Sequence, residues 1–168
     1  IDILRVLSAN VDFNHSEFDF IQLSGAWARE RHIVRTPLRS GGQCVESRRG
    51  ASSHAQNPFM ALVSHEANED VGDVYGFNLI YSGNFLANVE VDMHNNSRAQ
   101  IGINPFDFTW NLESKQEFQT PEVVMAYSPN GLTGMSHIYH DLYRERLVRG
   151  SYRDKERPIL INNWDATY

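Results

Sequence analysis

The sequence predicts an all-β protein in which two antiparallel sheets pack face to face and a single helix follows them. Three observations support this. Short runs with strand composition recur through residues 3–127, Gly, Pro, Asn and Ser separate these runs, and helical spacing begins only at Gly131. Repeated strands without intervening helices are typical of a large antiparallel sandwich.

The expected strands are short, and several of them alternate between apolar and polar residues. In the segment 86–93, Val89, Val91 and Met93 share one side, which predicts a strand with one buried and one solvated face. Gly83-Asn84 follows the preceding strand and predicts a hairpin turn with positive φ angles. The expected strands cover residues 3–9, 18–27, 31–38, 43–48, 59–64, 74–82, 85–93, 98–103, 108–113 and 123–127.

Residues 131–148 have a different spacing, because apolar side chains recur there every three or four residues. Asn130 and Gly131 before the segment and Gly150 after it are start and stop signals for a helix. Beyond this helix, Ile159, Leu160 and Ile161 follow Pro158 as a short apolar run, which predicts a strand buried on both faces.

These patterns divide the chain into three parts. We expect a sandwich at residues 1–130, a connecting helix and loop at 131–156, and the first strand of a further domain at 157–168. A buried strand needs neighbouring strands, and the chain opens on Ile1 inside a strand-like pattern. We therefore expect both ends to be cut from a longer protein.

The composition excludes several classes of protein. With 168 residues, 41% hydrophobic and 11% aromatic, the chain can form one domain with a sizeable core. It lacks the roughly 18 consecutive apolar residues of a spanning helix, so no membrane partner is expected. The net charge of −6 argues against a nucleic-acid partner. Cys44 is the single cysteine, which favours a reducing compartment, and we expect a cytoplasmic protein.

Residue types that often carry chemistry are sparse. His137 and His140, with Asp141, have the spacing of one helical face, but a zinc site needs further ligands and an oriented second shell. We therefore expect no metal and no cofactor. Cys44 lies near His54 in sequence, and an inert thiol is a better interpretation than a nucleophile.

Two features left more than one interpretation open. The segment 48–59 combines arginines, serines, a histidine and amides, and it is either a structural network or a ligand contact. Trp27 follows small residues at a strand end, and Trp164 follows another strand end, where parallel barrels keep their active sites. Each indole is either a packing residue or a platform for a sugar ring. Trp110 lies in an aromatic strand and is expected in the core.

At these residues the chain resembles the microbial α-galactosidases of glycoside hydrolase family 36. The resemblance covers essentially the whole chain. It is carried by SGAWARERH at 24–32, ESRRGASSHAQNPF at 46–59, YGFNLIYSGNFLANVEVD at 75–92, the segment 101–150 and RPILINNWDATY at 157–168.

The resemblance implies a fold and an activity. Family members have an N-terminal β-supersandwich of the galactose mutarotase type, a (β/α)8 catalytic barrel and a small C-terminal β-domain. They hydrolyse terminal α-galactosyl residues of melibiose- and raffinose-type oligosaccharides with retention of configuration, which requires two carboxylates. In the family both are aspartates on later barrel strands. The resemblance therefore implies that residues 1–168 contain no catalytic residue and are inactive alone.

The resemblance also assigns site residues. Trp164 matches the tryptophan of the first barrel strand, which faces the galactose pocket. Asp165 stands where the family usually has Glu, with the same charge and a side chain one methylene shorter. Trp27 matches a tryptophan of the β-domain that approaches the pocket. The implied partners are an α-galactoside, the chain's own catalytic barrel and further copies in a homotetramer. The alternative is a stand-alone galactoside-binding β-sandwich with Trp27 as its platform.

Overall fold

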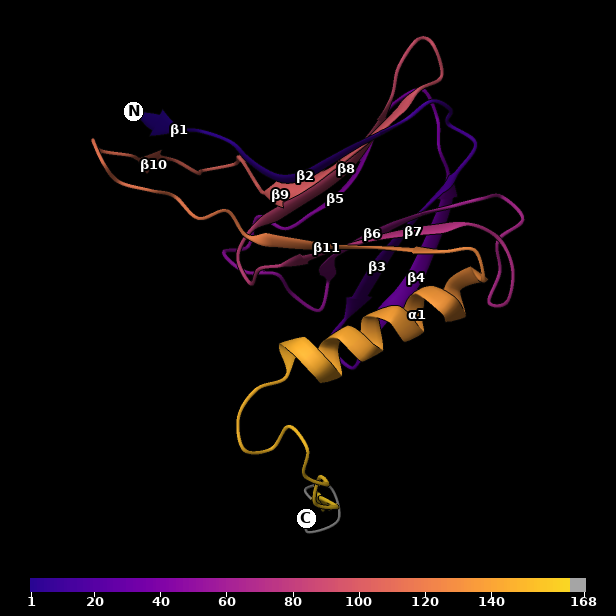
Figure 1. The fold of residues 1–168 in the computed structure, drawn as a ribbon, viewed down its shortest axis with the longest axis vertical. Coiled ribbons are helices and arrows are strands. Elements are labelled where there is room, and N and C mark those ends of the chain that lie inside the picture. The colour runs from indigo at the N-terminus through magenta and orange to yellow at the C-terminus, as the bar shows by residue number, and fades with distance from the viewer. Residues whose placement is uncertain (164–168) are drawn as a thin grey trace. The chain divides into compact units, whose positions relative to one another are not determined.

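The computed structural model describes residues 1–163 and confirms the predicted all-β architecture. The chain divides into two compact units, Ile1–Met135 and a second that begins at Ser136. The first unit is an antiparallel β-sandwich (Figure 1). Its strands are β1 (Asp2–Ile3), β2 (Val6–Phe13), β3 (Asp19–Ala26), β4 (Arg29–Pro37), β5 (Gly41–Glu46), β6 (Gln56–Val63), β7 (Val74–Ile80), β8 (Phe85–Val91), β9 (Ser97–Ile103), β10 (Trp110–Asn111) and β11 (Glu122–Ser128).

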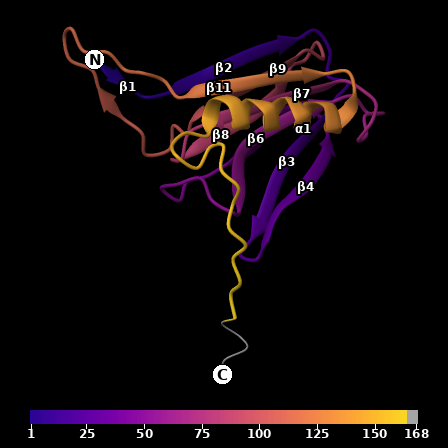
Figure 2. The same ribbon diagram turned by 60° about the horizontal axis from the view of Figure 1, so that its bottom comes forward.

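Two larger sheets form the layers of the sandwich. One has the strand order β11-β7-β6-β3-β4, and the other has the order β2-β9-β8-β5. A separate ladder pairs β1 with β10 and extends away from both sheets in Figures 1 and 2. Every pair of strands among residues 1–163 is antiparallel. The strands therefore pair as the alternating pattern predicts.

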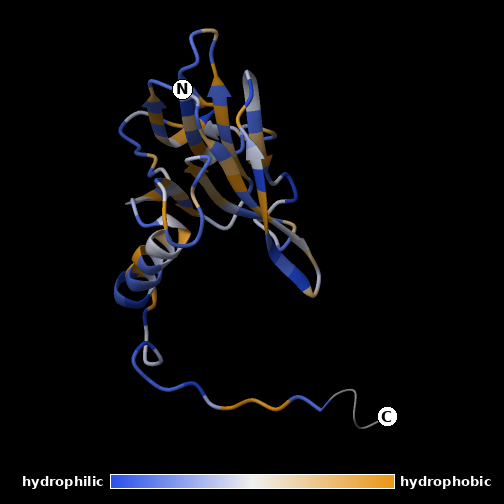
Figure 3. Cartoon of the chain, turned by 90° about the vertical axis from the view of Figure 1, so that its right-hand side faces the viewer, coloured by the Kyte–Doolittle hydropathy of each residue, from blue (hydrophilic) through white to orange (hydrophobic). Residues whose placement is uncertain are grey.

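The core lies between the two sheets. Phe20 and Leu62 are cross-strand neighbours on β3 and β6, and Val89 on β8 is completely buried. Figure 3 shows the corresponding alternation of hydrophobic and hydrophilic residues along the strands. Burying one such side chain contributes about 1.5–3 kcal/mol. The buried cluster comprises Phe18, Phe20, Val45, Met60, Leu62, Phe77, Leu79, Phe85, Ala87, Val89, Ala99 and Ile101.

The predicted hairpin at Gly83-Asn84 is wrong. β7 and β8 belong to different sheets, so the connection between them crosses from one layer to the other. Gly83 and Asn84 are not among the residues with positive φ angles. Both flanking strands have the expected composition, but composition does not say which sheet a strand joins.

Two predictions of burial are also wrong. Met93 is 91% exposed because β8 ends at Val91 and the chain turns there toward β9. Trp110 is 48% exposed because it lies on the β1–β10 ladder, where its ring packs on Phe118 with centroids 5.2 Å apart. This aromatic cluster is local and does not join the core between the sheets.

The predicted helix is present as α1 (Gly131–Leu142), which continues into a π-helical turn over Tyr143–Leu147. Among residues 1–163, no helix is both long enough and apolar enough to span a bilayer. Residues 148–163 form neither helix nor strand, and Ile159 is 95% exposed. Figure 3 shows a short hydrophobic stretch in this extended C-terminal part of the chain. A strand needs a hydrogen-bonded neighbour, and no described segment pairs with 159–161. The assignment of 157–168 to a barrel strand stays a prediction.

Candidate functional site

The tip of the β3–β4 hairpin presents the most exposed indole of the sandwich. Trp27 is 86% exposed and stands directly before Ala28, whose φ of 58° turns the chain into β4. The β3–β4 register shifts between Ser24 and Ala26, just before this turn. Packing does not account for a tryptophan with this much exposed surface. Trp27 therefore has the accessibility that a sugar platform requires, and its contact with a sugar stays a prediction.

Gly25 holds the hairpin tip close to the segment that precedes β6. A Cβ atom at this position would lie 2.5 Å from the Arg29 carbonyl oxygen and 2.9 Å from the His54 carbonyl oxygen. The Gly25 amide donates a hydrogen bond to the Ala55 carbonyl at 3.0 Å. Only glycine permits this approach without moving the backbone. The position of Trp27 is thus set by backbone contacts on both sides of the hairpin.

A shallow depression of about 280 Å³ lies on the same hairpin and is lined by Ser24, Gly25, Arg29 and His32. Arg29 and His32 are exposed, so their donors are available to solvent or to a ligand. Trp27 and this depression lie on the same hairpin, and a sugar needs both an apolar face for its C–H groups and donors for its hydroxyls. Neither Arg29 nor His32 stands out in the sequence from the other charged residues that follow Trp27. Pairing of the two expected strands around Trp27 places His32 opposite Ser24, and this pairing is the feature that could have pointed to His32.

Much of the segment 48–59, with its flanking residues Glu46 and Ser47, belongs to a polar network, which supports the structural interpretation. Its centre is Asn104, which is 2% exposed. The Asn104 Nδ2 group donates to Glu46 Oε2 at 2.9 Å and to the Ser47 carbonyl at 3.3 Å. Its Oδ1 accepts the Phe106 amide at 3.0 Å. One buried amide therefore joins the end of β5 to the chain that follows β9.

The remaining polar groups of this segment are also largely used internally. Ser47 Oγ donates to the Ala51 carbonyl at 2.6 Å, and the Gly50 amide donates to Asn84 Oδ1 at 2.7 Å. Arg49 Nη1 donates to Gln56 Oε1 at 2.5 Å. Because these groups satisfy one another, the segment is fixed and supports the hairpin tip through Ala55. Arg48, Arg49 and Gln56 also line a shallow depression of about 410 Å³, and a ligand contact there stays a prediction.

The other chemical candidates are weak. Desolvation of the sulfur and the charge of Glu46 raise the pKa of the Cys44 thiol, so it is protonated at neutral pH and is a poor nucleophile. Among residues 1–163, no group of three or more His, Cys, Asp or Glu side chains could hold a metal ion. Trp164 and Asp165 lie outside the described residues.

The fold is that of an antiparallel β-sandwich domain, and comparison with known proteins identifies its family. The model of the glycosyl hydrolase family 36 N-terminal domain matches residues 1–113, and the melibiase model matches residues 117–168. The chain belongs to glycoside hydrolase family 36.

Several relatives are similar over the whole chain. Alpha-galactosidase AgaA from Geobacillus stearothermophilus is 62% identical over 168 residues, which are 100% of this chain and 23% of that protein. Alpha-galactosidase Mel36A from Lactobacillus acidophilus is 46% identical over 98% of this chain and 22% of that protein. The chain thus spans about a quarter of the length of these relatives.

Solved structures agree with this assignment. The structure of AgaB from Geobacillus stearothermophilus has a TM-score of 0.95 and 63% identity, covering 99% of this chain and 23% of that one. Variants of AgaA with 62% identity were solved in complex with stachyose and with raffinose. These ligands belong to those proteins.

Proposed function

We propose that this chain is the non-catalytic β-domain of an α-galactosidase, together with the start of its catalytic domain. The parent enzyme hydrolyses terminal α-galactosyl residues of melibiose- and raffinose-type oligosaccharides by a retaining double displacement. The observation that carries the proposal is 62% identity to an α-galactosidase over the full length of the chain. The AgaA complexes with raffinose and stachyose support the choice of substrate class.

Three residues have proposed roles in sugar binding. Trp164 and Asp165 form one wall of the galactose pocket, the indole by stacking and the carboxylate by accepting hydrogen bonds from hydroxyls. Trp27 is a second platform supplied by the β-domain, and its 86% exposure supports that role. The catalytic carboxylates belong to the barrel, so residues 1–168 orient substrate and carry no chemical step.

The activity is tested with the full-length protein. We expect hydrolysis of p-nitrophenyl α-galactoside and raffinose, with the α-anomer of galactose as the first product in proton NMR. The chain 1–168 alone should be inactive under the same conditions. A full-length protein without α-galactosidase activity, or one whose first product is the β-anomer, would contradict the proposal.

The role of Trp27 is tested by Trp27→Ala in the full-length enzyme. Losing a stacking contact of about 1–1.5 kcal/mol should raise KM for raffinose roughly tenfold. Trp110→Ala is the matched control, because Trp110 is also an exposed tryptophan but lies on the β1–β10 ladder. Equal effects of the two substitutions would remove the specific role of Trp27. Trp164→Ala should raise KM and also lower kcat, because this ring orients the sugar at the reacting centre.

A stand-alone galactoside-binding module is the second candidate, and the exposed indole of Trp27 favours it. Titration of the chain 1–168 with galactose or raffinose, followed by tryptophan fluorescence, distinguishes the two functions. Saturable binding that disappears in Trp27→Ala supports the module, whereas no response supports a domain that needs its barrel.

We further propose that the parent enzyme is a cytoplasmic homotetramer. Light scattering of the full-length protein tests its assembly state.

A further inference from the structure

Arg35 on β4 is anchored by a buried carboxylate. Its Nε atom donates to Asp19 Oδ2 at 2.6 Å, and Asp19 is 8% exposed. The other carboxylate oxygen of Asp19 lies 2.8 Å from Nδ1 of His65. A buried carboxylate with a partner on each oxygen holds the guanidinium plane in one orientation. Arg35 thus differs from a solvated surface arginine.

The rest of the guanidinium binds the loop between β6 and β7, residues 64–73. Nη1 donates to the carbonyl of Ala67 at 2.6 Å. Nη2 donates to the carbonyls of Ser64 at 3.1 Å and His65 at 3.0 Å. The planar fork of arginine can make these contacts together, and a lysine ammonium cannot. A single side chain therefore fixes the first half of this loop to the five-stranded sheet.

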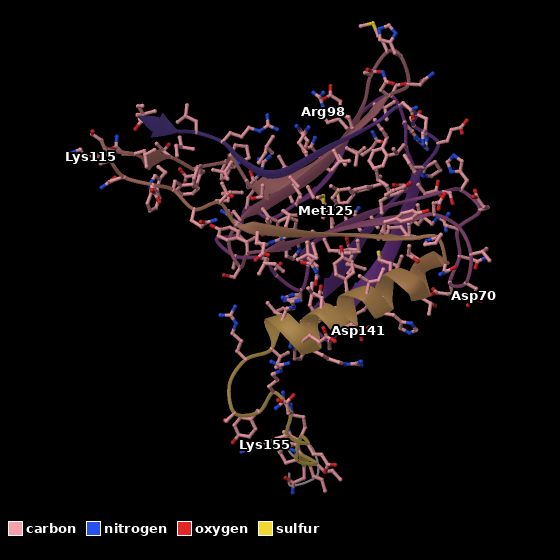
Figure 4. The ribbon with its side chains drawn as sticks, viewed as in Figure 1. Asp70, Arg98, Lys115, Met125, Asp141 and Lys155 are labelled. Atoms are coloured by element: carbon pink, nitrogen blue, oxygen red, sulfur yellow. The ribbon has the colours of Figure 1, made fainter. Side chains whose placement is uncertain are left out.

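The same loop, from Asn68 onward, caps the start of α1. The amide of Gly131 donates to the Gly72 carbonyl at 3.0 Å, that of Leu132 to Asn68 at 2.9 Å, and that of Thr133 to Glu69 at 3.0 Å. The first amides of a helix have no partner within the helix, so the loop supplies the acceptors. Figure 4 labels Asp70 of this loop beside the first turn of α1.

The loop and the start of the helix also fit tightly against each other. Within the loop, Gly72 has a φ of 97°, and a Cβ atom there would lie 2.5 Å from the Cα atom of Ala67, so the loop is tightly folded on itself. Gly131 has a φ of 64°, and a Cβ atom there would collide with the carbonyl oxygen of Asn68. Both neighbours are backbone atoms, which cannot move aside alone. A shift of the loop must therefore shift the first turn of α1.

We infer that Arg35 is a positioning residue, which acts through the loop 64–73 to fix the start of α1 on the sheet that carries Trp27. The inference rests on the proposed function, in which Trp27 contacts the sugar and the chain beyond α1 enters the catalytic domain. Arg35 itself touches no substrate. It affects catalysis by keeping the start of α1 at a fixed position on the sheet that carries Trp27.

The test uses Arg35→Lys in the full-length enzyme. Lysine keeps the charge and one contact to Asp19 but loses the fork that holds the loop. We expect KM for raffinose to rise about tenfold while kcat stays within about twofold, because sugar positioning is lost and the chemistry is not. We also expect amide exchange at residues 131–133 to accelerate about tenfold.

Arg98→Lys is the matched control. Arg98 forms a similar pair with Asp12 on the other sheet, through Nε at 2.6 Å and Nη2 at 3.2 Å, but it binds no loop. KM and exchange at residues 131–133 should stay unchanged in this variant. Gly131→Ala approaches the same contact from the helix side and should raise KM as Arg35→Lys does. It also replaces Arg35→Lys as the test if that variant does not fold.

A double-mutant cycle separates positioning from general destabilisation. In the Trp27→Ala background, Arg35→Lys should cause no further rise in KM, because the position of α1 relative to Trp27 no longer affects sugar binding once the indole is absent. Independent, multiplicative effects would overturn the inference. So would unchanged amide exchange at residues 131–133 in Arg35→Lys, whatever the activity. A full-length protein without α-galactosidase activity, or an unchanged KM in Trp27→Ala, would instead overturn the proposed function.

Discussion

Replacing Asn104 by alanine should destabilise the sandwich more than removing any exposed amide. Asn104 is buried, and its side chain bonds the end of β5 and the chain after β9. Alanine removes both the donors and the acceptor but leaves the backbone hydrogen bond from the Asn104 amide to the Asn84 carbonyl. The substitution therefore isolates the side-chain contacts.

The magnitude depends on which groups keep another partner. The Phe85 carbonyl, which also accepts from Asn104 Nδ2 at 3.2 Å, still accepts the Ser47 amide at 3.0 Å. Glu46 still pairs with Arg48 at 2.8 Å. The Ser47 carbonyl loses the contact that Asn104 Nδ2 makes at 3.3 Å. A buried acceptor without a partner costs about 1–3 kcal/mol. We expect a loss of about 2 kcal/mol in the free energy of unfolding, or about 4–8 °C in Tm.

Urea and thermal unfolding followed by circular dichroism measure this loss. Gln100→Ala is the matched control, because it removes a side-chain amide that donates to Asn10 Oδ1 at 2.8 Å on a more exposed face. That substitution should change stability by less than about 0.5 kcal/mol. If Asn104→Ala and Gln100→Ala have equal stability, the network around Asn104 does not contribute as its geometry indicates.

Two further predictions concern the loop at Gly72 and the pair of Arg98 with Asp12. Gly72→Ala should lower the free energy of unfolding by about 1–3 kcal/mol, because φ is 97° and the added methyl group would meet backbone atoms. Gly42→Ala is the control, because a Cβ atom at Gly42 has no neighbour within 4 Å. The hydrogen bond from Arg98 lowers the pKa of Asp12. A carboxyl with a lowered folded-state pKa contributes stability above its unfolded pKa and loses it as pH falls through the folded value. Urea unfolding should therefore show wild type more stable than Arg98→Gln above about pH 4, with the difference vanishing at lower pH. A constant difference across this range would contradict the assignment.

The strands and the helix could be predicted closely from the sequence. The expected strand at 18–27 is β3 (Asp19–Ala26), and the expected helix at 131–148 covers α1 and the π-helical turn after it. Periodicity reports which residues are buried, and burial defines these elements locally. The same signal could not separate a hairpin from a crossing at Gly83, nor a core strand from the β1–β10 ladder at Trp110. Those distinctions depend on pairing between distant segments.

The accessibility of the candidate site was also predictable, because Trp27 follows small residues and precedes charged ones. The side-chain contacts that hold the site in place were not predictable. Asn104 and Glu46 are 58 positions apart, and Arg35 and Ala67 are 32 positions apart. Arg35 has the same composition signal as its solvated neighbours Arg29 and Arg31. Only the tertiary contact with Asp19 distinguishes it, and no local pattern records that contact.

The Asn104 network and the Arg35 network share no residue, and each holds a different part of the β-domain in place. The Asn104 network holds the segment before β6, which reaches the Trp27 hairpin through the bond from Gly25 to Ala55. The Arg35 network holds the loop that caps α1. Groups without shared partners contribute almost independently to stability. A defect in the first network should therefore loosen the Trp27 hairpin without moving the start of α1. A defect in the second should leave the hairpin itself intact but shift the start of α1 relative to the sheet that carries Trp27. The two parts can then be perturbed separately, which a single core network would not permit.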